Sequence, residues 1–295
     1  MHRGPLALLG LLTAGLVLTA SLASGAGSFS DPVTVDSGEY DQMDPSVAVS
    51  SSGNISVVWT DIVDGVSTVF FAFSSDSGSS FSDKRRVGGE STIADQGSAV
   101  VAVNSNETIF VAWADEREGD YRIFLSKSMN HGANFSEPLK VASGNGSQRN
   151  PALAVQGEEV YLAWDEGYLS RLDVYFARSS NGGEDFSEPI KVSEPIEKSV
   201  ELMPSLDVWN DRVFIAWQDS RDIESRDNDL SIYGSWSYDS GDSFQPNVKV
   251  SGGGYQIDPS VAFLPEGNVT VAWEHRAEGS SVMACEMNEI KCSTV

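Results

Sequence analysis

The stretch Ile109-Phe-Val-Ala-Trp113 decides the fold of this chain, because four close copies of it occur at regular intervals. The copies are Ile55-Ser-Val-Val-Trp59, Val160-Tyr-Leu-Ala-Trp164, Val213-Phe-Ile-Ala-Trp217 and Val269-Thr-Val-Ala-Trp273. Successive tryptophans are 54, 51, 53 and 56 residues apart. A fixed period of this size indicates a repeat architecture, because one such unit cannot bury its apolar faces alone.

Each repeat is predicted to contain four short strands. The second strand ends at the tryptophan, and the alternation of apolar and polar residues with β-branched and aromatic content marks the others. No window shows a helical period. First strands are expected at 45–49, 98–103, 151–155, 204–208 and 259–263, third strands at 68–73, 122–126, 173–177, 230–236 and 281–287, and fourth strands at 84–87, 138–141, 189–192 and 246–250.

A turn of fixed spelling, Ser-x-Asp/Asn-x-Gly-x-x-Phe, separates the third strand from the fourth in four repeats. An Asp or Asn side chain can accept from backbone amides two residues on, and Gly accepts a positive φ. The Phe then folds back onto apolar surface. The conserved positions of the four turns are Ser74, Asp76, Gly78 and Phe81; Ser128, Asn130, Gly132 and Phe135; Ser179, Asn181, Gly183 and Phe186; Ser237, Asp239, Gly241 and Phe244.

This turn resembles the Asp-box, or BNR repeat, of the sialidase-like β-propeller superfamily. The resemblance covers residues 29–295 and rests on four regularly spaced copies. In that family the box is a structural hairpin on the rim, away from the active site. The resemblance therefore implies that Asp76, Asn130, Asn181 and Asp239 belong to the scaffold.

The strand count predicts an all-β, five-bladed propeller of four-stranded antiparallel blades over residues 27–295. Phe29-Ser-Asp-Pro-Val-Thr-Val35 matches Phe135-Ser-Glu-Pro-Leu-Lys-Val141, so it is predicted to be a fourth strand that precedes the first complete repeat. We expect it to complete the last blade, with Val33 beside the Val282 segment, which closes the ring and leaves no open edge. The alternative is the six-bladed ring usual for sialidases, which would need about fifty more residues.

Residues 1–26 have the composition of an export signal. Met1-His-Arg-Gly is basic, residues 5–22 are uncharged and apolar, and small residues follow. The alternative is an uncleaved N-terminal anchor. Five Asn-x-Ser/Thr sequons, at Asn54, Asn106, Asn134, Asn145 and Asn268, fit a glycoprotein of the cell surface or exterior.

The charge balance argues against nucleic acid and anionic lipid as partners. The chain has 19 basic and 43 acidic residues, a net charge of −24. Such a surface repels polyanions and promotes solubility. We expect a monomer that binds a glycan or an extracellular protein, with no contact to the membrane beyond the possible anchor.

Two cysteines are candidates for a disulfide, and one acidic loop is a candidate for metal binding. Cys285 and Cys292 are expected to form a local disulfide in an oxidising compartment, two free thiols being the alternative. No cofactor or metal site is predicted, although the dense carboxylates Asp219, Asp222, Asp227 and Asp229 could hold Ca²⁺ if they do not form a solvated loop.

Polar residues recur at the start of each repeat. Three positions before the first strand stand Gln42, Asp95, Gln148, Glu201 and Gln256; one position before it stand Asp44, Gly97, Asn150, Met203 and Asp258, with Arg149 beside them. They form either a polar funnel for a sugar, a cation or water, or caps that hydrogen-bond neighbouring blades around a water-filled channel.

Arginines follow three of the tryptophans. Arg117 and Arg221 lie in Trp-x-Asp-x-Arg motifs, and Arg276 lies in a partial copy. Asp and Arg two residues apart in an extended chain project to the same side, so they can form ion pairs within or between blades. The alternative is that the three guanidinium groups converge on a carboxylate ligand.

The catalytic pattern of the sialidases is missing. No Arg-Ile-Pro motif occurs, and no spacing singles out a Tyr and Glu pair among Tyr40, Tyr121, Tyr168 and Tyr255. The sequence therefore favours a non-catalytic surface module that binds glycan or protein. The alternatives are a pure scaffold and a glycoside hydrolase, sialidase-like or using a pair from Asp44, Asp95, Glu201 and Asp258.

Overall fold

A computed structural model describes residues 31–89, 94–168, 171–196, 199–223, 230–251, 254–276, 280–288 and 291–294. It divides the chain into two compact units, Met1–Pro32 and Val33–Val295. The predicted leader over residues 1–26 lies outside the described residues. Within them, no helix has the length and apolar character to cross a membrane.

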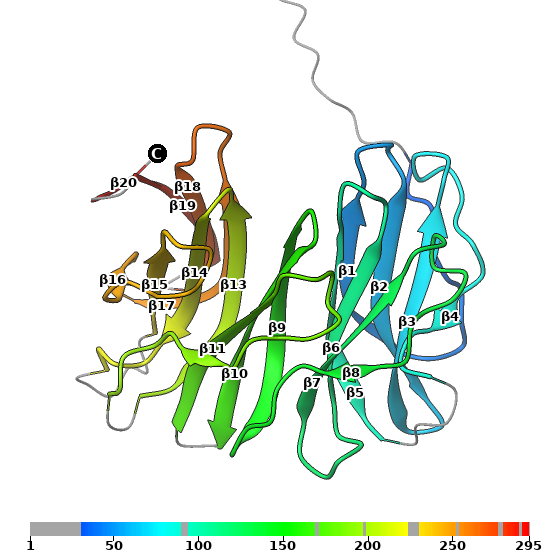
Figure 1. The fold of residues 1–295 in the computed structure, drawn as a ribbon, viewed down its shortest axis with the longest axis horizontal. Helices are drawn as coiled ribbons and strands as arrows, with labels where there is room; N and C mark the ends of the chain where they lie inside the picture. Colours follow the sequence, from blue (N-terminus) through cyan, green and yellow to red (C-terminus); the bar gives the residue numbers. More distant parts are fainter. Residues whose placement is uncertain are drawn as a thin grey trace, which may run out of the picture. The chain divides into compact units, whose positions relative to one another are not determined.

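The second unit consists of five four-stranded antiparallel sheets, each in the order of the chain, as Figure 1 shows. Sheet 1 contains β1 (Gln42–Val49), β2 (Ile55–Val63), β3 (Val66–Ser74) and β4 (Arg85–Arg86). Sheet 2 contains β5 (Gln96–Val103), β6 (Ile109–Asp115), β7 (Arg122–Ser128) and β8 (Leu139–Lys140). Sheet 3 contains β9 (Ser147–Gln156), β10 (Glu159–Tyr168), β11 (Arg171–Ser179) and β12 (Ile190–Lys191).

The last two sheets repeat the pattern. Sheet 4 contains β13 (Glu201–Trp209), β14 (Arg212–Asp219), β15 (Ser231–Ser237) and β16 (Val248–Lys249), and sheet 5 contains β17 (Tyr255–Phe263), β18 (Val269–Arg276), β19 (Ser280–Asn288) and β20 (Lys291–Thr294). The prediction of five four-stranded sheets is confirmed. Each sheet corresponds to one sequence repeat, except that β20 supplies the last fourth strand.

The hydrophobic core lies between successive sheets. The first strands of neighbouring sheets contact one another from β1 to β17, and we call them the inner strands. Trp113, Trp164 and Trp217 are completely buried in the clusters that join sheets 1 to 2, 2 to 3 and 3 to 4. Each tryptophan removes a large apolar surface from water, which accounts for its recurrence in every repeat.

The predicted closure by the N-terminal strand is not found. The outer edge of β19 pairs with β20 from Cys285 to Asn288, and no described residue of the N-terminal segment pairs beside Val282. Residues 31–41 form no strand, and Val35 packs beside Trp59 of sheet 1. A hairpin partner a few residues away closes a much shorter loop than a partner at the other end of the chain, which lowers the entropic cost of pairing.

Sheets 1 and 5 consequently do not form the expected junction. The pairs of strands in substantial contact within the described residues include no pair between these two sheets. Figure 1 draws sheet 1 in blue and sheet 5 in orange and red at opposite sides of the view. The five sheets therefore do not form a closed ring in this structure.

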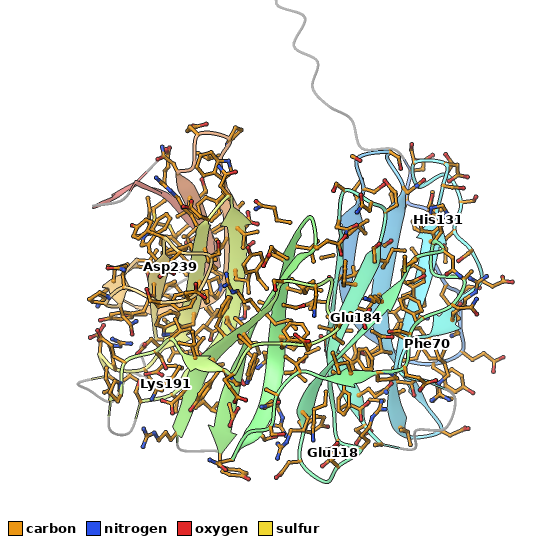
Figure 2. All side chains as sticks on the ribbon, in the orientation of Figure 1. Phe70, Glu118, His131, Glu184, Lys191 and Asp239 are labelled. Carbon is orange, nitrogen blue, oxygen red and sulfur yellow. The ribbon has the colours of Figure 1, made fainter. Side chains whose placement is uncertain are left out.

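Backbone hydrogen bonds sort the loops into two faces, as predicted from the antiparallel order. The loops that enter the inner strands bond to the loops between second and third strands, as in Glu116 N to Asp95 O at 3.0 Å. We call this side the entry face. Figure 2 labels Glu118, in the β6–β7 loop on the entry face, and His131, in the β7–β8 turn, at opposite ends of sheet 2.

Candidate functional site: the inner-strand cavity

Every inner strand contains a β-bulge near its start. One residue of each bulge adopts the left-handed conformation, with φ between 50° and 53°: Asp44, Ser98, Asn150, Met203 and Asp258. A proline follows four of them, and proline is tolerated at a bulge because no ladder hydrogen bond is lost there. Asp and Asn accept this conformation more readily than other residues with a side chain. Five bulges at one register therefore mark a feature built into every repeat.

The five bulges line one cavity of about 460 Å³. Its lining residues are Asp44, Pro45, Ser46, Ser98, Ala99, Val100, Asn150, Pro151, Met203, Pro204, Asp258 and Pro259. The lining combines two carboxylates, an amide and hydroxyls with small apolar surfaces, and it contains no aromatic side chain. This combination suits a small polar ligand more than a flat apolar one.

The structure corrects the predicted alignment of the second repeat by one residue. The bulge shift falls between Gly97 and Val100, so Ser98 is the counterpart of Asp44, in place of Gly97. Gln96 then takes the place assigned to Asp95. The sequence alignment failed here because this repeat lacks the proline that marks the bulge elsewhere, and Ala99 stands in its position.

The recurring amides belong to the interior of the sheets, not to the cavity. Gln96 Nε2 donates to Asp115 Oδ2 at 2.8 Å, and Gln96 Oε1 accepts from Val69 N of the preceding sheet at 3.1 Å. Trp113 Nε1 donates to the same carboxylate at 3.0 Å. The glutamine thus joins a buried Trp and Asp pair to the neighbouring sheet, which satisfies polar groups that would be costly to bury alone.

The same arrangement recurs in sheet 3 and is modified in sheet 5. Gln148 Nε2 donates to Glu166 Oε2 at 2.9 Å, and Gln148 Oε1 accepts from Ile123 N at 3.1 Å. In sheet 5, His275 stands where the other sheets have an acid, and Trp273 Nε1 donates directly to Gln256 Oε1.

Glu201 replaces the glutamine in sheet 4. Its side chain is fully buried, and Arg221 Nη2 lies 4.0 Å from Glu201 Oε1. Burial raises the pKa of Glu201 to about 7; the carboxylates of Asp219 and Asp173 add to this, while Ser193 and Arg221 oppose it. Glu201 is not among the cavity-lining residues.

The remaining predicted carboxylates occupy different places. Asp44 and Asp258 line the cavity from sheets 1 and 5, and Asp258 Oδ1 accepts from Gln218 Nε2 at 3.2 Å. Asp95 lies in the loop that enters sheet 2, where its Oδ1 accepts from Ser67 N at 2.9 Å. The structure therefore brings two of the four candidate acids to the cavity.

One acidic residue near the cavity was missed by the sequence analysis. Asp165, directly after Trp164, is buried and accepts from Asn150 Nδ2 at 2.7 Å and from Met203 N at 3.0 Å. It thus joins the bulges of sheets 3 and 4. Burial raises the pKa of Asp165 to about 6, against the effect of these two donors. The sequence did contain a sign of this residue: the position directly after the tryptophan is acidic in this repeat, whereas two other repeats have Thr60 and Ala114 there.

The three candidate arginines each pair with an acid of their own sheet, and two also bond to the preceding repeat: Arg117 Nη2 donates to Gly88 O at 3.2 Å, and Arg221 Nη1 donates to Glu194 Oε2 at 3.2 Å. Their ion pairs are Arg117 to Asp115 at 2.5 Å, Arg221 to Asp219 at 2.7 Å and Arg276 to Glu274 at 2.7 Å. Arg117 also lies 4.5 Å from the ring centroid of Phe124, and Arg221 4.1 Å from that of Tyr233. None of the three lines the cavity, and Arg149 stacks on Tyr121 at 4.5 Å.

The four Ser-x-Asp/Asn turns share one internal network on the face opposite the entry loops. In the first, Ser74 Oγ donates to Asp76 Oδ1 at 2.7 Å and accepts from Gly78 N at 2.9 Å. Asp76 Oδ1 also accepts from Ser80 N at 2.9 Å. Hydrogen bonds from the Ser80 hydroxyl and amide lower the pKa of Asp76 to about 2. These contacts all lie within the turn itself.

The disulfide and calcium predictions fall partly outside the described residues. Cys285 is buried and disulfide-bonded, while the side chain of Cys292 lies beyond the described part, so their pairing stays a prediction. Residues 224–229, with most of the acidic loop, are also outside it. Asp222 accepts from Tyr233 and Lys249 at 2.8 and 2.7 Å. The described residues contain no cluster of three potential metal ligands.

Comparison with known proteins identifies the fold. No protein-family model matches the chain, and no curated protein matches it in sequence. Its structure is similar to that of a protein of unknown function from Dyadobacter fermentans, with 13% identity, a TM-score of 0.66, and coverage of 84% of this chain and 79% of the other. The chain has the fold of a β-propeller.

Two further similar structures are sugar-cleaving enzymes. An α-L-arabinanase from Penicillium chrysogenum has 12% identity, a TM-score of 0.61, and coverage of 83% of this chain and 82% of the other. The GH93 α-L-arabinofuranosidase of Fusarium graminearum has 11% identity, a TM-score of 0.63, and coverage of 86% and 83%. Identities this low indicate a shared fold only. The chemistry of this chain therefore depends on its own residues.

Proposed function

We propose that this propeller is an exported, non-catalytic module that binds a glycan in the inner-strand cavity. The observation that carries the proposal is the convergence of five left-handed bulges on one cavity lined by Asp44, Ser98, Asn150 and Asp258. Carboxylate, amide and hydroxyl groups are the partners that sugar hydroxyls need. A volume of about 460 Å³ suits a small saccharide unit.

The state of the other charged groups favours binding over hydrolysis. A glycosidase needs an acid and a base that both reach the scissile bond. Glu201 and Asp165 carry raised pKa values suited to a general acid, but both are buried and neither lines the cavity. Arg117, Arg221 and Arg276 are engaged in ion pairs within their sheets, so they do not supply a carboxylate clamp.

A glycan array with the mature chain tests the proposal. We expect binding to a defined set of glycans, weakened at least about tenfold by Asp258→Asn or Asp44→Asn, because the amide accepts fewer hydrogen bonds from sugar hydroxyls. The control is Asp185→Asn, an exposed residue of a Ser-x-Asp/Asn turn on the other face. Retained binding in both cavity variants, or capture of an extracellular protein through another surface, would contradict the proposal.

A glycoside hydrolase is the second candidate, and one observation favours it. Asp44 and Asp258 line the same cavity at equivalent positions, as a catalytic carboxylate pair would. Assays with chromogenic α-L-arabinofuranosides and fluorogenic sialosides decide between the two functions. We expect no turnover. Turnover that is lost in Asp44→Asn and kept in Asp185→Asn would establish the hydrolase instead.

A further inference from the structure

The four junctions between successive sheets are built from equivalent side chains. At the first junction, Val58, Val69 and Phe71 of sheet 1 pack in one buried cluster with Trp113 of sheet 2. Their equivalents Ala112, Ile123 and Leu125 pack with Trp164, and Ala163, Val174 and Phe176 pack with Trp217. The third-strand residues Val69, Ile123, Val174 and Ile232 are all 0% exposed.

Sheet 5 has Ala272, Val282 and Ala284 at these positions, and among the described residues no other sheet packs against them. Met283 pairs with Trp273 as Phe70 pairs with Trp59, so Val282 is the equivalent of Val69. Val282 is 82% exposed where its four equivalents are completely buried. This face is therefore one half of a junction without its other half.

Sheet 1 presents the complementary half. Val47 is 62% exposed, whereas its equivalents Val101 and Leu206 are each 7% exposed and the other two, Leu153 and Val261, are partly buried. Gln42 is exposed although its equivalents in the other four sheets are buried. A hollow of about 220 Å³ lies against Trp59, lined by Val35, Asp36, Gln42, Met43, Pro45, Val57 and Trp59.

The hollow beside Trp59 lacks what the other junctions supply. At the junction of sheets 1 and 2, Val69 fills the space next to Trp113, and Val69 N donates to Gln96 Oε1. In sheet 5, Val282 is the residue in a position to do the same for Trp59 and Gln42. Sheet 5 is the one surface among the described residues that carries this set of side chains unpaired, and within one chain it lies apart from sheet 1.

We infer that the face of sheet 5 in one copy of the chain docks on the face of sheet 1 in a second copy. The contact is head to tail, because the two patches differ, and it repeats the geometry of the four junctions within the chain. It buries Val282 against Trp59, covers Val47, and supplies a backbone donor to Gln42. The sequence predicted a monomer, whereas the proposed contact predicts an assembly of copies.

Sedimentation velocity of the full mature chain, with Val47→Asp and Val282→Asp as variants, tests the assembly. The wild type is expected to form a dimer or a larger head-to-tail oligomer. Each variant alone is expected to be monomeric, with affinity reduced at least about 100-fold, because a carboxylate would be buried without a partner. Both side chains are exposed in the single chain, so the circular dichroism spectrum and Tm of each variant should match the wild type.

An equimolar mixture of the two variants gives the decisive result. Val47→Asp keeps an intact sheet 5 and Val282→Asp keeps an intact sheet 1, so the mixture is expected to form a heterodimer through one junction. A wild type that stays monomeric, a single variant that still self-associates, or a mixture that stays monomeric would each overturn the inference.

A cross-linking experiment provides an independent measurement. Gln42→Cys and Val282→Cys proteins, mixed under mild oxidation, are expected to give a disulfide-linked heterodimer. In a chain carrying both substitutions, a bond that forms within one chain instead of between two would overturn the inference in favour of intramolecular closure.

Discussion

At the scale of single residues, the most informative position is the one that holds glutamine in sheets 1, 2, 3 and 5 and Glu201 in sheet 4. Gln96 and Gln148 each donate to a buried acid and accept from the preceding sheet. A glutamate cannot donate to Asp219 when ionised. Burial is the main cause of the raised pKa of Glu201, and the nearby carboxylate of Asp219 adds to it.

Replacing this acid with an amide should stabilise the protein in a pH-dependent way. The pKa of Glu201 is raised to about 7 from 4.5, so the folded state holds the proton more tightly and stability falls as pH rises from about 4.5 to about 7. Glu201→Gln removes this loss. We expect the free energy of unfolding to rise by about 1–3 kcal/mol near pH 8, with the gain vanishing below about pH 4.5.

Urea unfolding of wild type and Glu201→Gln across this pH range measures the effect. The reciprocal control is Gln148→Glu, which should destabilise the protein near pH 8 because it places a second carboxylate beside Glu166. A gain in Glu201→Gln that is the same at all pH values would show that the carboxyl ionisation is not its cause.

At the scale of the elements, each Ser-x-Asp/Asn turn packs closely against a sheet at the position of its glycine. A Cβ at Gly132 would lie 1.9 Å from Phe71 Cε1 of the preceding sheet. The equivalent Gly78 has no sheet before it, and its Cβ would meet Ile55 Cδ1 at 3.1 Å. Both have positive φ, 74° and 86°, so backbone strain is common to the two positions.

Alanine substitution at these glycines should separate packing from backbone strain. We expect Gly132→Ala to lower the free energy of unfolding by about 2–4 kcal/mol, because overpacking adds to the cost of a left-handed alanine. Gly78→Ala should cost about 1–2 kcal/mol from the backbone alone. Chemical denaturation of both variants measures the difference, and equal losses would contradict the packing explanation.

The elements also show which features a sequence of this kind can predict. The five tryptophan strands and four turns predicted the sheets, because each repeat carries its own periodicity. The register of Gln96 was missed by one residue, because Ala99 gives no local sign of the bulge. The partner of β19 was missed for another reason. Both the N-terminal segment around Val33 and β20 could pair with this strand, and the local sequence pattern does not tell which pairing has the lower free energy.

The candidate site was predictable in part for the same reasons. Asp44, Asn150 and Asp258 were found because prolines follow them, whereas Ser98 and Asp165 lack such a signal. Whether an acid faces the cavity or the sheet interior depends on a pleat that alternates at every residue. Glu201 and Asp44 lie two positions apart in the repeat, so the pleat alone would put them on one face, and it is the bulge at Asp44 that gives them different environments.

At the scale of the whole molecule, the net charge of −24 opposes association of two copies. The proposed contact is apolar, so salt should strengthen it by screening the repulsion. We expect the dissociation constant to fall at least about tenfold between about 0.05 M and about 1 M NaCl. Sedimentation velocity at several salt concentrations measures this, and weaker association at high salt would point to ion pairs instead.

The bulges and the tryptophan interiors are separate parts of each repeat, and this separation affects how the protein can change over time. A substitution at Asp44, Ser98 or Asn150 alters the wall of the cavity without disturbing the Trp, acid and Gln contacts that join the sheets. New specificities can therefore arise one repeat at a time, provided that the new residue tolerates the left-handed backbone of the bulge. A directed library at the five bulge positions would be a practical source of engineered binders.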